Sequence, residues 1–170
     1  MKNIIFVGMP AVGKSTVGVV AAKRLGYQFI DTDLLIQKQE GRLLKDIIAD
    51  VGIDGFLKIE DQVNSGVNVE NSVISPGGSI IYCKNAMEHY KKIGIVVYLQ
   101  ASFETINSRL ENAKNRGVVL KEGQTLKGLY DERVALFEKY ADVTVCQDNI
   151  ELEDSVDAVI EALGKKDFTN

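Results

Sequence analysis

Short apolar runs alternate with longer amphipathic segments along this chain. The runs are rich in β-branched residues, which predicts buried β-strands. The segments between them carry apolar side chains every three or four positions, which predicts helices. Strands are expected over residues 3–7, 27–30, 72–75, 94–99 and 143–146. Helices are expected over residues 14–25, 84–92, 102–111, 125–141 and 152–163, and over most of 33–69 with breaks near Gly41 and Gly52.

Strands that alternate with helices form a parallel sheet covered on both faces. The sequence therefore predicts an α/β protein of three layers, with a five-stranded parallel sheet flanked by helices. Its 170 residues fit one domain over 1–170. The stretch 112–124 is polar and punctuated by glycine, so a mobile loop is expected there.

The composition of the chain indicates which kinds of binding partner to expect. Hydrophobic residues make up 45% of the chain, charged residues 26%, and the net charge is −4, which disfavours a nucleic-acid-binding surface. The opening MKNIIFVGMP turns straight into a glycine loop, unlike a signal peptide. No apolar stretch approaches the roughly 20 residues of a membrane span. We expect a cytoplasmic monomer that binds a small molecule, with neither a nucleic acid nor a membrane as partner.

Residues 8–15 read Gly-Met-Pro-Ala-Val-Gly-Lys-Ser and match the phosphate-loop motif in full. Glycines at both ends of the loop let backbone amides face phosphate oxygens, Lys14 places a positive charge on the β- and γ-phosphates, and Ser15 offers a hydroxyl to Mg²⁺. A predicted strand precedes the loop and a helix follows it. This predicts an ATP site in a P-loop NTPase fold and leaves the acceptor open. The loop residues expected to contact nucleotide are Gly8, Ala11, Val12, Gly13, Lys14, Ser15 and Thr16.

Asp31-Thr32-Asp33 follows the second predicted strand. Ligands of an open parallel sheet bind beyond the carboxyl ends of its strands. One carboxylate there can hold Mg²⁺ while the other accepts a proton from an attacking hydroxyl. The alternative is structural, because aspartate is also a good N-cap for the helix that follows.

Five segments in this order resemble the shikimate kinase family. They are residues 8–16, Asp31-Thr32-Asp33, the Gly-Phe-Leu-Lys-Ile-Glu segment 55–60, Ser-Pro-Gly-Gly over 75–78, and Arg133. The resemblance implies an ATP- and Mg²⁺-dependent kinase that phosphorylates the 3-hydroxyl of shikimate. It also implies the nucleoside monophosphate kinase type of fold, with a closing lid at 112–124 and a substrate-binding helical region at 33–62.

The resemblance assigns roles on the acceptor side. It implies that Asp33 binds the acceptor hydroxyls and serves as base, that amides of Gly77 and Gly78 face the substrate, and that Arg133 binds its carboxylate. From the residues alone, Arg133 lies on the inward stripe of a predicted helix and needs a partner there. That partner is either a ligand carboxylate or, structurally, Glu60 or Asp33.

On the donor side, the resemblance places Asp31 near Mg²⁺ and Arg109 against the adenine. Arg116 falls where the family has a lid arginine that reaches the transferring phosphate. A flexible, glycine-flanked position suits a lid residue. The alternative for Arg116 is a solvated surface charge.

The chain departs from the family pattern mainly on the acceptor side. Leu57 replaces an arginine that would clamp the shikimate carboxylate, and this loss costs roughly 1.5–3 kcal/mol of binding unless something compensates. Lys58 is the candidate replacement, although one residue along a helix is a rotation of about 100°. Ser79 stands where a third glycine is usual. Two alternatives stay open: a related kinase of another small hydroxylated metabolite, such as gluconate or a nucleotide, and a nucleotide-binding regulatory module without kinase activity.

Overall fold

The computed structural model describes residues 2–112, 118 and 120–164. Its helices and strands follow the alternation expected from the sequence, with boundaries within two residues for most of them. The elements in chain order are β1 (Asn3–Val7), α1 (Lys14–Leu25), β2 (Gln28–Asp31), α2 (Thr32–Glu40), α3 (Leu44–Ser65), β3 (Ser72–Ser75), the 3₁₀ turn η1 (Ile80–Tyr82), α4 (Lys84–Ile93), β4 (Gly94–Gln100), α5 (Phe103–Asn112), α6 (Leu126–Tyr140), β5 (Val143–Cys146) and α7 (Leu152–Gly164).

The five strands form one parallel sheet in the order β2-β3-β1-β4-β5. This confirms the predicted sheet. The central strand β1 is buried along its whole length and pairs with β3 on one side and β4 on the other. The loop that follows β1 therefore leaves the sheet from its middle, at the carboxyl edge where α/β proteins bind ligands.

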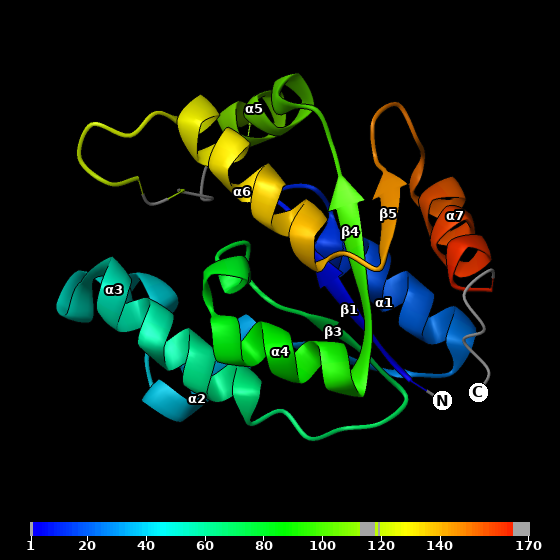
Figure 1. Ribbon diagram of the computed structural model, residues 1–170, viewed down its shortest axis with the longest axis horizontal. Coiled ribbons are helices and arrows are strands. Elements are labelled where there is room, and N and C mark those ends of the chain that lie inside the picture. The colour runs from blue at the N-terminus through cyan, green and yellow to red at the C-terminus, as the bar shows by residue number, and fades with distance from the viewer. Residues whose placement is uncertain (1, 113–117, 119, 165–170) are drawn as a thin grey trace.

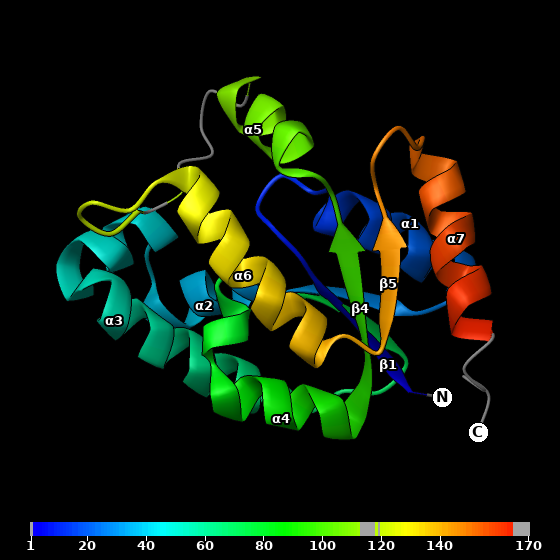
Figure 2. The ribbon, with the colours of Figure 1, turned by 45° about the horizontal axis from the view of Figure 1, so that its top comes forward.

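Helices cover both faces of the sheet (Figures 1 and 2). α1 and α7 pack together on one face, while α4 and α6 lie on the other. The main core joins these layers, and within it the rings of Tyr98 on β4 and Phe137 on α6 stack with centroids 5.1 Å apart. This three-layer arrangement confirms the predicted fold class.

A second, smaller apolar cluster lies apart from the main core, between α2 and α3. Its buried members are Ile36, Ile47 and Phe56, and Leu44 and Ile48 are among the side chains that pack on it. α3 bends at Gly52, whose dihedral angles (φ 72°, ψ 178°) are not helical. The expected breaks at Gly41 and Gly52 are thus confirmed. Residues 66–69 are not helical, although most of 33–69 was expected to be, and the hydrophobic pattern does not predict η1.

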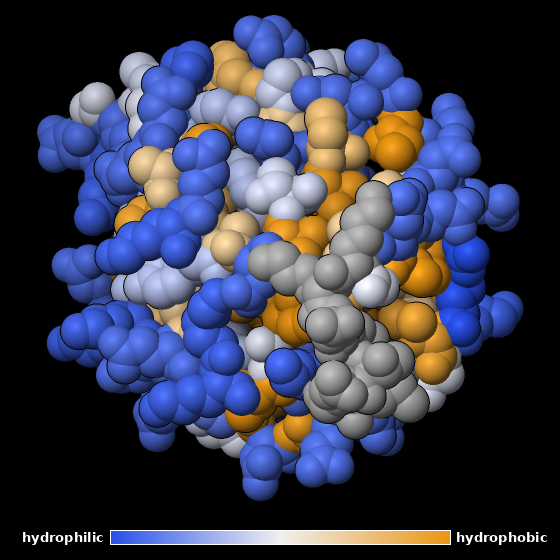
Figure 3. Space-filling view, turned by 45° about the vertical axis from the view of Figure 1, so that its right-hand side comes forward, coloured by the Kyte–Doolittle hydropathy of each residue, from blue (hydrophilic) through white to orange (hydrophobic). Residues whose placement is uncertain are grey.

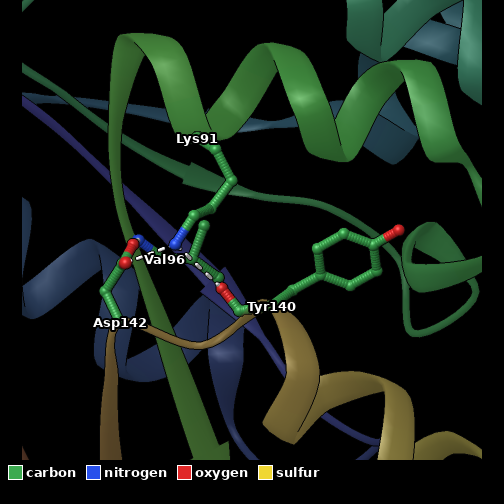
Figure 4. Close-up of polar contacts among 4 residues, drawn as sticks. All are labelled: Lys91, Val96, Tyr140 and Asp142. Atoms are coloured by element: carbon green, nitrogen blue, oxygen red, sulfur yellow. Dashed lines mark hydrogen bonds and ion pairs between the residues drawn. The ribbon is translucent and has the colours of Figure 1, made fainter.

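A small group of polar contacts joins the segment before β5 to β4 and α4 (Figure 4). The backbone amide of Val96 on β4 donates a hydrogen bond to Oδ2 of Asp142 at 2.9 Å, and Lys91 of α4 forms an ion pair with Oδ1 of the same carboxylate. Lys91 also donates to the carbonyl of Tyr140, at 3.4 Å. Together these bonds fix the point where the chain leaves α6 and enters the sheet.

The face around α7 is mostly hydrophilic, with apolar side chains showing in separate patches (Figure 3). Within the described ranges, no helix combines the length and the apolar character needed to cross a membrane. Residues 113–117 and 119 of the expected lid, Arg116 among them, lie outside the described residues. The lid itself stays a prediction.

Candidate active site

The phosphate loop wraps tightly between β1 and α1. Gly8 has φ 155°, and a Cβ there would lie 2.6 Å from the carbonyl oxygen of Leu99, so only glycine fits. Gly13 also has a positive φ, 107°, and forms the N-cap of α1. The loop thus places free helical amides at the amino end of α1, which is an anion-binding arrangement.

Two basic side chains donate hydrogen bonds to backbone carbonyls of this loop, one from the loop itself and one from α5. Lys14 is 9% exposed, and its Nζ donates to the carbonyl oxygens of Gly8 at 2.8 Å and Met9 at 3.0 Å. Arg109 of α5 donates from one terminal nitrogen to the carbonyls of Ala11 at 3.2 Å and Val12 at 3.0 Å. Arg109 therefore lies beside the loop, as its expected role requires, and its contact with adenine stays a prediction.

An open cleft of about 650 Å³ leads from the phosphate loop to the turn after β3. Ser15 and Thr16 line it from the first turn of α1, and both are exposed. Asp31 and Asp33 line it from the end of β2 and the start of α2. The cleft therefore brings the predicted nucleotide and metal residues together with an acidic pair.

The two aspartates have different surroundings. The carboxylate of Asp31 caps α2 by accepting a hydrogen bond from the backbone amide of Asp33 at 2.9 Å. Burial raises the pKa of Asp33 to about 6, and the negative charge of Asp31 adds to this, while Lys14 acts in the opposite direction. Asp33 is thus poised to take up or release a proton near neutral pH. Asp31 is therefore a helix cap, as the structural alternative expected, and it also faces the cleft, whereas the metal and base roles of the pair stay predictions.

A second cavity of about 160 Å³ adjoins this cleft and shares Pro10, Asp33 and the Gly77-Gly78 turn with it. Its polar lining also includes Ser79 and Arg133. Aliphatic and aromatic side chains form the opposite wall: Leu44, Ile48, Ile53, Phe56 and Leu57. The cavity suits a small molecule with one apolar face and a few polar groups.

Close packing at the glycine turn explains its two glycines. A Cβ on Gly77 would lie 3.1 Å from Oδ1 of Asp33 and 3.1 Å from Oε1 of Glu60. A Cβ on Gly78 would lie 2.9 Å from Cδ of Pro10 and 3.1 Å from a terminal nitrogen of Arg133. Side chains at these positions would push the acidic and basic groups away from the cavity.

Arg133 reaches the cavity from α6. It is 8% exposed, and its guanidinium carbon lies 5.5 Å from the centre of the Tyr82 ring. Among the described residues, none forms a hydrogen bond with its Nε. A buried cation with a spare donor at a cavity wall is suited to an anionic ligand group.

Glu60 of α3 is a part of the site that the sequence reasoning considered only as a structural partner for Arg133. Its side chain is fully buried, and Ser79 donates a 2.6 Å hydrogen bond to Oε2. Oε1 has no hydrogen-bond partner within the described part of the chain. Burial raises the pKa of Glu60 to about 7, and Asp33 adds to this. The sequence contained one sign of this role: Glu60 follows the apolar Phe56 by four positions, so both lie on the same, inward face of the predicted helix.

One of the expected site residues is not brought into the cavity. Lys58 is exposed, and it is not among the residues that line the cavity or the cleft. The helical rotation away from Leu57 explains its outward position. Arg116 lies outside the described residues, so its role stays a prediction.

Comparisons with known proteins agree with this geometry. The family model described as shikimate kinase matches residues 10–164. A shikimate kinase from Clostridium botulinum (strain 657 / Type Ba4) is 38% identical over 170 residues, covering 97% of this chain and 98% of the relative. One from Sulfurihydrogenibium sp. (strain YO3AOP1) is 40% identical over 134 residues, covering 78% and 81%.

A solved structure of shikimate kinase from Acinetobacter baumannii in complex with shikimate superposes with a TM-score of 0.88 at 28% identity. It covers 99% of this chain and 96% of the other. A gluconokinase from Sinorhizobium meliloti 1021, at 18% identity and a TM-score of 0.62, shares the fold. The family match and the relatives span nearly the whole chain, so this chain belongs to the shikimate kinase family.

Proposed function

We propose that this protein transfers the γ-phosphoryl group of ATP to the 3-hydroxyl of shikimate. The main support for the proposal is that the phosphate-loop cleft adjoins the smaller cavity lined by Arg133. A complete phosphate loop opens into a cleft that shares Asp33 and the glycine turn with a small cavity, and Arg133 faces that cavity. Donor and acceptor sites are therefore adjacent, as phosphoryl transfer requires. Membership of the shikimate kinase family supports the choice of acceptor.

On the donor side, the chain's own groups hold and neutralise the phosphates. Amides of the phosphate loop and the amino end of α1 bind the phosphate oxygens, and Lys14 adds a positive charge beside them. The hydroxyl of Ser15 and the carboxylate of Asp31 are oxygen donors in the same cleft, a ligand set that suits Mg²⁺. When bound, Mg²⁺ supplies charge neutralisation at the phosphates.

On the acceptor side, Asp33 accepts the proton of the attacking hydroxyl. Its raised pKa, about 6, lets it be ionised at neutral pH and still basic enough to draw that proton. Arg133 binds the carboxylate of the substrate and orients its ring. The apolar wall of α3 packs against the ring and excludes water from the reacting oxygen.

A panel of acceptors, followed by ADP release, tests the proposal. Shikimate, gluconate and a nucleoside monophosphate are compared at saturating MgATP. We expect shikimate-dependent turnover and none above background with the others. Turnover of gluconate or of the nucleotide without turnover of shikimate would reassign the acceptor. Tight ATP binding with no active acceptor would instead support a regulatory module.

Replacing Leu57 with arginine is expected to lower KM for shikimate about tenfold or more, with a small change in kcat. Leu57 lines the cavity beside Arg133, so an arginine there provides a second charged hydrogen bond to the carboxylate. Leu57→Gln is the matched control, because it adds length and polarity without charge. An unchanged or higher KM for a folded Leu57→Arg protein contradicts the idea that an arginine at position 57 binds the shikimate carboxylate.

A further inference from the structure

Positions 57 and 79, where the resemblance implies an arginine and a glycine, both lie near Glu60. Leu57 is three residues before Glu60 on α3, so the two side chains share one face of that helix. Ser79, just before η1, donates its hydroxyl to Oε2 of Glu60 at 2.6 Å. The thiol of Cys83 makes a longer contact with the same oxygen, at 3.8 Å. The two departures therefore converge on one buried carboxyl group.

Glu60 in turn lies next to groups that face the acceptor. Its Oε1 and Oδ1 of Asp33 approach Gly77 equally, each 3.1 Å from the position that a Cβ would take there. The positive charge of Arg133 acts on Glu60 as well, lowering its pKa. Glu60 thus lies beneath the glycine turn, between the base and the cation of the proposed acceptor site.

A buried carboxyl group needs donors, because burial without them is costly. An arginine at position 57 would be near enough to Glu60 along α3 to supply them, whereas leucine cannot. In this chain the donor comes from Ser79, in the turn after β3. A glycine at position 79 would leave Glu60 with the weak donor Cys83.

We infer that Ser79 is a positioning residue which compensates for Leu57: its hydroxyl holds Glu60, and the negative charge of Glu60 holds the guanidinium of Arg133 in place for the acceptor. The inference rests on the proposed function and deepens it. Serine at 79 and leucine at 57 then form a matched pair. With arginine at 57, Glu60 no longer needs the serine hydroxyl as a donor, and with a residue at 79 that lacks a donor, leucine at 57 leaves Glu60 without a strong one.

The charges around Glu60 agree with this assignment. Burial and the neighbouring Asp33 raise its pKa, whereas the hydrogen bonds from Ser79 and Cys83 and the charge of Arg133 lower it. Burial raises the pKa of Tyr90 on α4 and of Cys83, and the negative charge of Glu60 adds to both shifts. Ser79 is thus the group whose removal most directly disfavours an ionised Glu60.

A double-mutant cycle between positions 57 and 79 tests the inference. Alone, Ser79→Ala is expected to raise KM for shikimate about tenfold, with kcat changed less than about threefold, because the hydrogen bond that holds Glu60, whose charge acts on Arg133, is lost. In the Leu57→Arg background the same change is expected to raise KM less than about twofold. Ser79→Thr keeps the hydroxyl and should restore most of the wild-type KM.

Ser65→Ala is the matched control. Ser65 lies on the same helix as Glu60 and donates to the carbonyl of Asp61, away from the cavity. Its loss should leave KM unchanged. Equal KM effects of Ser79→Ala in both backgrounds, or a folded Ser79→Thr protein as impaired as Ser79→Ala, overturn the inference.

Thermal unfolding against pH separates this inference from the proposed function, because it needs no acceptor. The pKa of Glu60 in the native state, about 7, is above the ordinary glutamate value. At pH values between the ordinary pKa and about 7, the native state therefore binds more protons than the unfolded state, and stability falls as pH rises. Ser79→Ala raises that pKa further and should steepen the fall between pH 6 and 8. Leu57→Arg should flatten it. Parallel curves for wild type and Ser79→Ala overturn the inference even if shikimate proves to be the wrong acceptor.

Discussion

Replacing Lys14 with alanine is expected to lower kcat for phosphoryl transfer by about 10²- to 10³-fold or more. In the proposed mechanism Lys14 supplies a positive charge beside the transferring phosphate, and its side chain is buried, where charge acts strongly. Its ammonium also holds two carbonyls of the phosphate loop, so the loop loses both its charge and an internal brace. ADP release at saturating MgATP and shikimate measures the effect.

The loss should be chemical and not a failure to fold. Lys14 lies at the start of α1, outside the apolar core, so the melting temperature is expected to change by no more than roughly 5 °C. Lys14→Met is the matched control, because it keeps much of the side chain's length and removes only the charge. Substantial turnover by folded Lys14→Ala protein would sink the assignment of the donor site.

Replacing Asp33 with asparagine is expected to reduce kcat by about 10²- to 10⁴-fold, the usual contribution of a general base. Asparagine keeps the size of the side chain and cannot accept the proton of the acceptor hydroxyl. The affinity for ATP should stay close to that of the wild type, because the phosphate loop is unchanged. Single-turnover transfer and equilibrium nucleotide binding, measured on the same protein, separate the two effects.

The pH profile gives a second test of Asp33. Its carboxyl group must be ionised to act as base, and its pKa is raised to about 6. The wild-type rate is therefore expected to rise with pH through about 6 and then to level off. Asp31→Asn keeps a good helix cap and removes a negative charge that raises the pKa of Asp33, so the rise should move to lower pH. A rise that stays in place, or moves upward, contradicts the role given to Asp33.

The hydrophobic pattern was sufficient to predict the sheet, since buried parallel strands have an unmistakable composition and the phosphate-loop motif fixes the strand before it. The donor residues were predictable for the same reason, because the chemistry of that loop lies in consecutive residues. Even Arg109 was placed beside the loop, although its bonds to the carbonyls of Ala11 and Val12 have no trace in the local sequence.

The acceptor cavity was harder to predict, because it is assembled from α2, α3, α6 and the turn after β3. Lys58 illustrates the difficulty: a lysine next to a missing arginine looked like a replacement, and the helix turns it to the outside. The bond from Ser79 to Glu60 joins residues 19 positions apart. Only the packing of η1 against α3 brings them together, and the sequence did not predict η1.

The separate apolar cluster between α2 and α3 bears on how this protein changes over evolutionary time. Leu44, Ile48 and Phe56 belong to that cluster and also form a wall of the acceptor cavity. The phosphate loop instead leaves the central strand of the main core. Substitutions in the small cluster therefore reshape the acceptor wall, and at Leu44 and Ile48 also one side of the cleft, while the main core that supports the phosphate loop is left unchanged. Selection can explore new acceptors on one half of the molecule while the other half keeps its chemistry.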